Sequence, residues 1–163
     1  MIQSRELAAP DVETVLAIAA ASPEAAAWNR QEYEQILTHR GNNFCRVAEQ
    51  DGGVVGFVCF RVVGEDAELL NLAVLPPFRR QGIGVLLVQQ MLREVAEKGA
   101  KRIFLEVRDS NLPALRLYEH LGFETVGRRP GYYTNPPADA LVLQRRLTGR
   151  PEMPANANGS NLS

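Results

Sequence analysis

Apolar and polar positions alternate along this chain with two different periods, and the changes of period separate expected strands from expected helices. Runs rich in valine, phenylalanine and cysteine cover residues 44–49 and 54–63. The Asp-Gly pair between them is typical of a tight hairpin. A third run follows at residues 67–74, and residues 2–8 form an expected first strand ahead of all three. These segments predict the antiparallel part of a β-sheet.

Other segments repeat their apolar residues every three or four positions, as a helix packed on a core does. Helices are expected from Pro10-Asp11 onward and over residues 30–38. A further helix is predicted to begin at Asn111, which can cap it, and to close at Gly122 in the position that glycine favours after a helix. The longest helical pattern lies behind Gly84, with apolar residues at Leu87, Val88, Met91, Leu92 and Val95.

The order of these elements predicts the sheet topology. The long helix ends near Gly99 and a strand is expected at residues 102–107, so a strand–helix–strand connection joins two parallel strands by a right-handed crossover. Two final strands are expected at residues 123–129 and 140–147, joined by a loop over residues 130–139. Together the elements predict an α/β fold, with a mixed, mainly antiparallel sheet covered by helices on both faces.

Length and composition predict one globular domain. The chain has 163 residues, of which 45% are hydrophobic and 23% charged, as in ordinary soluble proteins. We expect the domain to cover residues 1–147 and residues 148–163 to form a disordered tail, since that segment is polar and rich in turn residues. The net charge is −1, so no general basic surface indicates a nucleic-acid partner.

Neither a metal site nor a membrane segment is expected. Cys45 and Cys59 lie outside any metal-ligand spacing, and with only His39 and His120 in the chain a zinc site is not predicted. The cysteines are interpreted as buried, reduced thiols. The apolar run at residues 15–21 is short and follows acidic residues, which fits neither a signal peptide nor a membrane span. We expect a cytoplasmic protein of undetermined oligomeric state.

A basic, glycine-containing loop between a strand and a helix is the first candidate site. Residues 71–84 read NLAVLPPFRRQGIG, and the long helix follows directly. The free N–H groups and the dipole of a helix N-terminus, next to Arg79 and Arg80, suit a phosphate-bearing ligand. Gly82 and Gly84 would let that ligand approach the backbone. The simpler alternative is a turn in which glycine only bends the chain.

Two phosphate-binding motifs are excluded by spacing. The dinucleotide fingerprint needs a third glycine where Leu87 stands, and the Walker loop needs a Gly-Lys-Ser/Thr sequence that the chain lacks.

Two further side chains are candidates for chemistry. Glu106 lies between Leu105 and Val107 in an expected strand, a costly position for a carboxylate unless it faces a cleft or a partner. The alternative is a structural salt bridge to Arg108 or to a neighbouring strand. Tyr118 lies on the helix that follows, where the alternative is an aromatic residue at the edge of the core.

The loop Arg-Arg-Gln-Gly-Ile-Gly resembles the acyl-CoA pyrophosphate loop of the GCN5-related N-acetyltransferase (GNAT) family. The segment LEVRDSNLPALRLYEHLGF resembles the corresponding part of the bacterial ribosomal-protein-alanine N-acetyltransferases within that family. Residues from about 2 to 147 can be laid on the family. The resemblance implies a sheet splayed between its fourth and fifth strands, with acetyl-CoA in the gap.

The resemblance also implies roles for individual residues. Glu106 would be the general base and Tyr118 the general acid for direct attack of an amine on the thioester. The Val74 N–H would stabilise the developing oxyanion, and Arg79 would be a charge at the edge of the site. Contacts to acetyl-CoA are implied for Leu72, Ala73, Val74, Arg80, Gln81, Gly82, Ile83, Gly84, Val85 and Asn111.

The acceptor is predicted from the closing segment. RRPGYYTNPPADALVLQRRL resembles the RRNYY loop of the family, which implies that Tyr132 and Tyr133 line a peptide groove, although the extra prolines could reshape it. The expected function is acetyl-CoA-dependent acetylation of a protein N-terminus, foremost alanine on a ribosomal protein, without a metal. Acetylation of a small amine or a lysine side chain is the alternative enzyme activity, and a CoA-binding sensor is the alternative without turnover.

Overall fold

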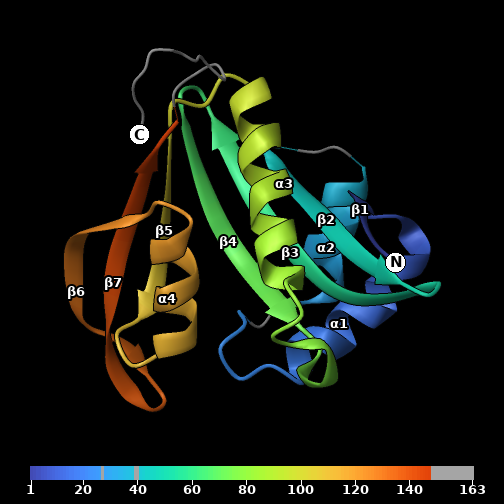
Figure 1. The fold of residues 1–163 in the computed structure, drawn as a ribbon, viewed down its shortest axis with the longest axis horizontal. Coiled ribbons are helices and arrows are strands. Elements are labelled where there is room, and N and C mark those ends of the chain that lie inside the picture. The colour runs from blue at the N-terminus through green and yellow to red at the C-terminus, as the bar shows by residue number, and fades with distance from the viewer. Residues whose placement is uncertain (27, 39–40, 148–163) are drawn as a thin grey trace.

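A computed structural model describes residues 1–26, 28–38 and 41–147 of the chain, and in them a seven-stranded sheet is covered by helices on both faces (Figure 1). The strands are β1 (Ile2–Glu6), β2 (Asn43–Gln50), β3 (Gly53–Val63), β4 (Asp66–Val74), β5 (Arg102–Arg108), β6 (Glu124–Thr134) and β7 (Pro137–Arg146). The helices are α1 (Val12–Ala20), α2 (Arg30–Leu37), α3 (Ile83–Glu97) and α4 (Leu112–His120), with short 3₁₀ turns η1 (Ala9–Asp11) and η2 (Pro76–Phe78).

The strands lie in the order β1-β2-β3-β4-β5-β7-β6. All neighbours are antiparallel except β4 and β5, which the helix α3 connects in parallel. The predicted mixed sheet and the predicted crossover are therefore confirmed. Because β7 lies between β5 and β6, a side chain of β6 must reach across β7 to contact one of β5.

Two apolar cores lie on the two faces of the sheet. On one face, α3 and α4 pack on the sheet through residues such as Leu87, Met91 and Leu105. On the other, α1 and α2 pack on β2, β3 and β4 through residues such as Val15 and Phe57. In Figure 1, α3 lies over β3 and β4 while α4 lies over β5 and β7. The boundary between β4 and β5 thus falls between the two helices.

The strands β4 and β5 pair only at one end. Their register contains three pairs, the last of which joins Glu68 to Phe104, and beyond it the two strands diverge (Figure 1). A bulge in β4 leaves Leu70 without a partner on β3, and such bulges bend a strand and increase its twist. The sheet is therefore split between its fourth and fifth strands, as the resemblance implied.

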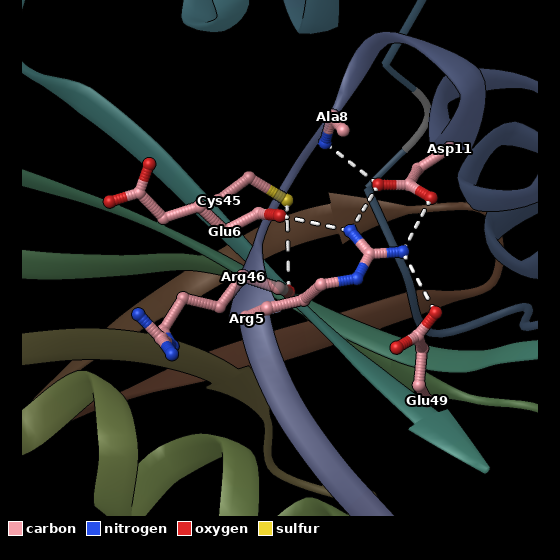
Figure 2. Close-up of polar contacts among 7 residues, drawn as sticks. All are labelled: Arg5, Glu6, Ala8, Asp11, Cys45, Arg46 and Glu49. Atoms are coloured by element: carbon pink, nitrogen blue, oxygen red, sulfur yellow. Dashed lines mark hydrogen bonds and ion pairs between the residues drawn. The ribbon is translucent and has the colours of Figure 1, made fainter. Parts of the chain in front are cut away.

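An ion-pair cluster fixes the start of the chain against the sheet (Figure 2). The guanidinium of Arg5 donates to both carboxylate oxygens of Asp11, over 2.7 and 3.0 Å, and to Glu49 of β2 over 3.1 Å. The same Asp11 carboxylate accepts the N–H of Ala8 over 2.7 Å. The cluster joins β1, the turn before α1 and β2, so it holds α1 on its face of the sheet.

The structure corrects three expected element boundaries. The first strand ends at Glu6, because the backbone turns into η1 and α1 begins only at Val12. The expected loop over residues 130–139 is wrong: β6 continues to Thr134 and β7 starts at Pro137. A register shift between Arg129 and Tyr133 takes up Pro130 and Gly131 without ending the pairing. The tail expected at residues 148–163 lies outside the described residues.

Candidate active site

One edge of β4 is open beside the gap. Leu72, Ala73 and Val74 pair with β3 on one side, but β5 offers them no partner among the described residues on the other. Backbone groups of these residues that point away from β3 can therefore form strand-like hydrogen bonds with a ligand, since buried backbone polar groups need partners. This is the position in which the resemblance placed the acetyl group and the arm of acetyl-CoA.

The glycine loop ends in an uncapped helix. Gly82 is the N-cap of α3 with a φ of +82°, and no side chain caps the helix. The first helical backbone bond runs from the Leu86 N–H to the Gly82 carbonyl, so the N–H groups of Ile83, Gly84 and Val85 have no backbone acceptor among the described residues. Arg80 also has a positive φ, of 65°. The loop directs several free donors to one place, as an anion site requires.

The space in front of the loop suits a ligand. A Cβ on Gly82 would meet nothing within 4 Å, and one on Gly84 would meet only the Cδ2 of Leu117, at 3.6 Å. That contact also shows that α4 passes close to the loop. The surface in front of the loop is therefore open, while the positive φ of Gly82 also fits the alternative of a glycine that bends the chain.

The side chains of the loop do not all face a ligand. Arg79, expected to be a charge at the edge of the site, is exposed. Its Nε donates to the Val74 carbonyl over 3.0 Å and its Nη2 to Ser22 Oγ over 3.3 Å. The side chain of Gln81 donates to the Pro77 carbonyl over 3.3 Å. Both side chains therefore brace the loop. Its backbone N–H groups and the Arg80 side chain remain candidates for contacts to a ligand.

Gly56 is a supporting residue that the sequence interpretation missed. A Cβ at this position on β3 would lie 3.0 Å from the Ala73 carbonyl oxygen, 3.3 Å from Val74 and 3.4 Å from Ile83. Its absence lets the end of β4 and the start of α3 meet over β3. The available signal was a glycine inside an otherwise apolar strand, which often marks a close approach of backbones.

Tyr118 lies on α4, on the face of the sheet that α3 and α4 cover. The side chain is buried, and its ring packs edge-on against Phe123 with centroids 5.5 Å apart. Burial raises the pKa of the Tyr118 phenol well above its usual value, because the charged form would lose its hydration. Within the described residues its hydroxyl has no hydrogen-bond partner. The group therefore stays protonated at neutral pH and is available as a donor.

Asn111 has a structural role in addition to the contact with acetyl-CoA that the resemblance implies. Its Oδ1 accepts the N–H of Ala114 over 3.3 Å and so caps α4, as expected. Within the described ranges its side-chain N–H group makes no hydrogen bond, so that group could donate to a ligand.

Glu106 lies on the opposite face of the sheet. Along β5, Ile103, Leu105 and Val107 point into the core beneath α3 and α4, so Glu106 points to the other side. There its Oε2 forms an ion pair with the Nε of Arg129 on β6. Glu106 thus forms a salt bridge, but its partner is Arg129 of β6 and neither Arg108 nor a residue of a neighbouring strand, since β7 lies between β5 and β6. Glu106 stands two residues beyond the last β4–β5 pair, at the start of the gap.

A cavity of about 1000 Å³ lies beside Glu106. It forms because α1 and α2 cover β2 to β4 and leave β5 uncovered on this face. Side chains of opposite charge line it in pairs, Arg61 with Glu68 and Arg129 with Glu106. The other lining residues are Gln35, Gly41, Asn42, Asn43, Val63, Asp66, Ala67, Phe104, Leu105 and Val142.

The two tyrosines expected in a peptide groove stand together on β6. Their rings meet edge-on with centroids 5.0 Å apart. Tyr132 is exposed and its ring lies near the Arg129 guanidinium, 5.8 Å away. The nearby Glu106 carboxylate raises the pKa of the Tyr132 phenol, first by accepting its hydrogen bond and then by its charge. Tyr132 thus stands close to Glu106, while Tyr133 packs against Arg108.

Polar contacts hold the β6–β7 hairpin in place. Arg108 donates to the carbonyls of Pro136 and Asn135, over 2.7 and 3.2 Å. At the other side of the hairpin, Asp139 accepts from Arg128 over 2.7 Å and from the Gly131 N–H over 2.8 Å. These hydrogen bonds lower the pKa of Asp139 below its ordinary value. They give the hairpin that carries both tyrosines a fixed shape.

Within the described ranges, no group of three or more histidine, cysteine or acidic residues is placed to hold a metal ion. Cys45 and Cys59 are free and buried, as expected. None of the described helices is both long and apolar enough to span a membrane.

Comparisons with known proteins point to one family. The model of the acetyltransferase (GNAT) family matches residues 12–123. The [ribosomal protein bS18]-alanine N-acetyltransferase of Escherichia coli (strain K12) is 35% identical over 71% of this chain and 78% of its own length. A Bacillus subtilis (strain 168) protein, to which the same activity is provisionally assigned by name, is 33% identical over 85% of this chain and 91% of its own.

A solved structure agrees with these matches. The crystal structure of the ribosomal-protein-S18-alanine N-acetyltransferase from Escherichia coli superposes with a TM-score of 0.78 at 28% identity, covering 100% of this chain and 99% of that one.

Proposed function

The chain belongs to the GNAT family of acetyltransferases and is an N-acetyltransferase, and from this premise we propose that its acceptor is the α-amino group of a protein N-terminus. Alanine is the first residue to test, because both relatives described above are named for ribosomal-protein alanine acetylation. One observation carries the proposal: a candidate acid and a candidate base lie on opposite faces of the sheet, at a gap between β4 and β5.

The donor side of the gap fits acetyl-CoA, which the family uses. The uncapped N-terminus of α3 and the glycines at 82 and 84 offer N–H groups and space for a pyrophosphate. The open edge of β4 at Leu72 to Val74 would hold the pantetheine arm. The Val74 N–H is the proposed donor to the thioester oxygen, which gains negative charge as the amine attacks.

The acceptor side of the gap is the cavity beside Glu106. An α-amino group has a pKa near 8 and arrives mostly as an ammonium ion at neutral pH. Glu106 would take the proton, which frees the nitrogen lone pair to attack the thioester carbon. The exposed Tyr132 and the neighbouring Tyr133 would then lie along the first residues of the acceptor chain.

The leaving group, the CoA thiolate, would depart on the face of the sheet that α3 and α4 cover. As the carbon–sulfur bond breaks, the sulfur carries the electron pair and needs a proton. Tyr118 is protonated at neutral pH and would give its proton to the sulfur. The proton that the new amide nitrogen must still lose would then restore the phenol. Each of the two proton transfers is worth roughly 10²- to 10⁴-fold in rate. We place all of this chemistry in a domain of residues 1–147.

One assay separates the proposed acceptor from other possibilities. The protein is incubated with acetyl-CoA and panels of N-terminal peptides, lysine peptides with blocked N-termini and small amines, and free thiol is followed. Turnover of alanine-initiated peptides above the rest supports the proposal. Preference for a small amine or a lysine side chain overturns the acceptor, and CoA binding without turnover indicates a sensor.

A further inference from the structure

The carboxylate that is proposed to accept the proton already has a cation bound to it. Glu106 Oε2 pairs with Arg129 Nε, and Arg129 comes from β6, which β7 separates from β5. The arginine therefore reaches across a whole strand to this carboxylate. Both side chains line the cavity of about 1000 Å³ into which an acceptor would enter.

The two partners differ in their freedom to move. The Glu106 side chain is 21% exposed, whereas that of Arg129 is 60% exposed. In the part of the chain that the structure describes, Arg129 has no second ion-pair partner. Exposed ion pairs are weak, because water screens them and the long side chains lose entropy when they are held. Arg129 is thus the member of the pair that can leave at small cost.

An acceptor amine enters as a cation and needs the same carboxylate. We propose that Arg129 is a displaceable counter-ion of Glu106, whose place the acceptor's ammonium group takes on binding. The inference rests on the proposed role of Glu106 as base. It makes Arg129 a residue that determines specificity: a ligand with an amine must displace the guanidinium, and a ligand without one cannot replace it.

A pair of matched ligands tests this exchange. The first is an alanine-initiated hexapeptide, and the second carries a propionyl group in place of alanine and so lacks only the amine. Binding of each is measured by calorimetry in the presence of CoA. In Arg129→Gln, the amine peptide should bind about two- to fivefold more tightly, which corresponds to the weak pair that it no longer has to break. Binding of the propionyl peptide should not change.

Three further variants make the test specific. Arg129→Lys keeps a cation and should bind both peptides as the original protein does. Arg128→Gln, the neighbour on β6 whose ion pairs are with Asp109 and Asp139, should leave the ratio of the two affinities unchanged. In Glu106→Gln, the additional change Arg129→Gln should no longer favour the amine peptide. A thermal melt establishes that each variant is folded.

The proposal is overturned if Arg129→Gln weakens the amine peptide, if both peptides change by the same factor, or if the gain persists in Glu106→Gln. Failure of the proposed function is distinct: the unaltered protein would then acetylate no peptide, and both proposals would fall.

Discussion

Arg79 Nη2 donates a hydrogen bond to Ser22 Oγ, 3.3 Å away, and so joins the glycine loop to the end of α1, 57 residues earlier in the chain. Ser22 is buried, and its own hydroxyl donates to the Ile18 carbonyl over 3.0 Å. Asn71 of β4 makes a second link, with its side-chain amide bonded to both backbone groups of Ala26. The glycine loop and β4 therefore both hold the segment that follows α1.

The first prediction concerns Arg79→Gln. Because this guanidinium braces the glycine loop against Val74 and Ser22, its loss should weaken acetyl-CoA binding about two- to tenfold, the worth of one ordinary hydrogen bond. The KM for the acceptor should change less. Two-substrate kinetics measure both constants, with Arg93→Gln on the exposed surface of α3 as the control. A rise confined to the acceptor KM would instead show that Arg79 acts through the segment between α1 and α2.

Gly84→Val tests the donor site. The position has room for a Cβ, with only Leu117 at 3.6 Å, and it lacks the positive φ that would strain a substitution at Gly82. We therefore expect a folded protein whose CoA affinity falls at least tenfold, since the side chain would occupy the space in front of the N–H groups. Calorimetry with CoA, beside a thermal melt, checks this. Unchanged affinity in the folded variant would remove the loop from the site.

Tyr118→Phe removes one hydroxyl and keeps the packing against Phe123. If Tyr118 protonates the departing thiolate, kcat should fall about 10²-fold or more while acetyl-CoA binds nearly as before, because the donor acts in the transition state. Steady-state rates and equilibrium binding separate the two effects. Full activity in a stable variant would leave Tyr118 with a structural role only.

Glu106→Gln should lower the rate most at neutral pH. The loss should shrink as the pH rises past about 8, because the acceptor amine then deprotonates without a base. Measuring the rate against pH for this variant and for the original protein shows whether the two rates converge at high pH. A purely structural carboxylate would give a lower melting temperature and a constant rate ratio across the pH range.

Asp11→Asn tests the cluster of Figure 2, away from the site. The hydrogen bonds from Arg5 lower the pKa of Asp11 below its ordinary value of 3.8, against the opposing effect of burial. A carboxylate with a depressed pKa stabilises the fold above its unfolded pKa, and this contribution is lost as the pH falls through the folded value.

The substitution should therefore lower the free energy of unfolding by about 1–3 kcal/mol at pH 7. The difference from the original protein should narrow as the pH falls below 3.8 and through the lower pKa of the folded state, where Asp11 also becomes neutral. Denaturant unfolding at pH 7, 5 and 3 measures it. A difference that stays constant with pH would show that packing, not charge, makes Asp11 important.

Much of the fold could be predicted from the sequence because periodicity is a local property. The strand at residues 67–74, the glycine loop and the helix behind it each have their own apolar spacing or turn chemistry within a few residues. Gly122, expected just after α4, lies there with a φ of +91°. The β6–β7 hairpin was misjudged because prolines normally end a strand, whereas a bulge and the contacts of Arg108 keep this one paired.

The residues that carry the candidate chemistry could be named from local sequence, since the glycine loop, a glutamate within an apolar strand and a tyrosine on the next helix are all visible in one dimension. What these side chains face depends on the tertiary fold. Insertion of β7 between β5 and β6 brings Arg129 to Glu106, and the alternation of β5 turns Glu106 away from Tyr118 toward the cavity. Such contacts depend on strand order and register, which no local pattern encodes.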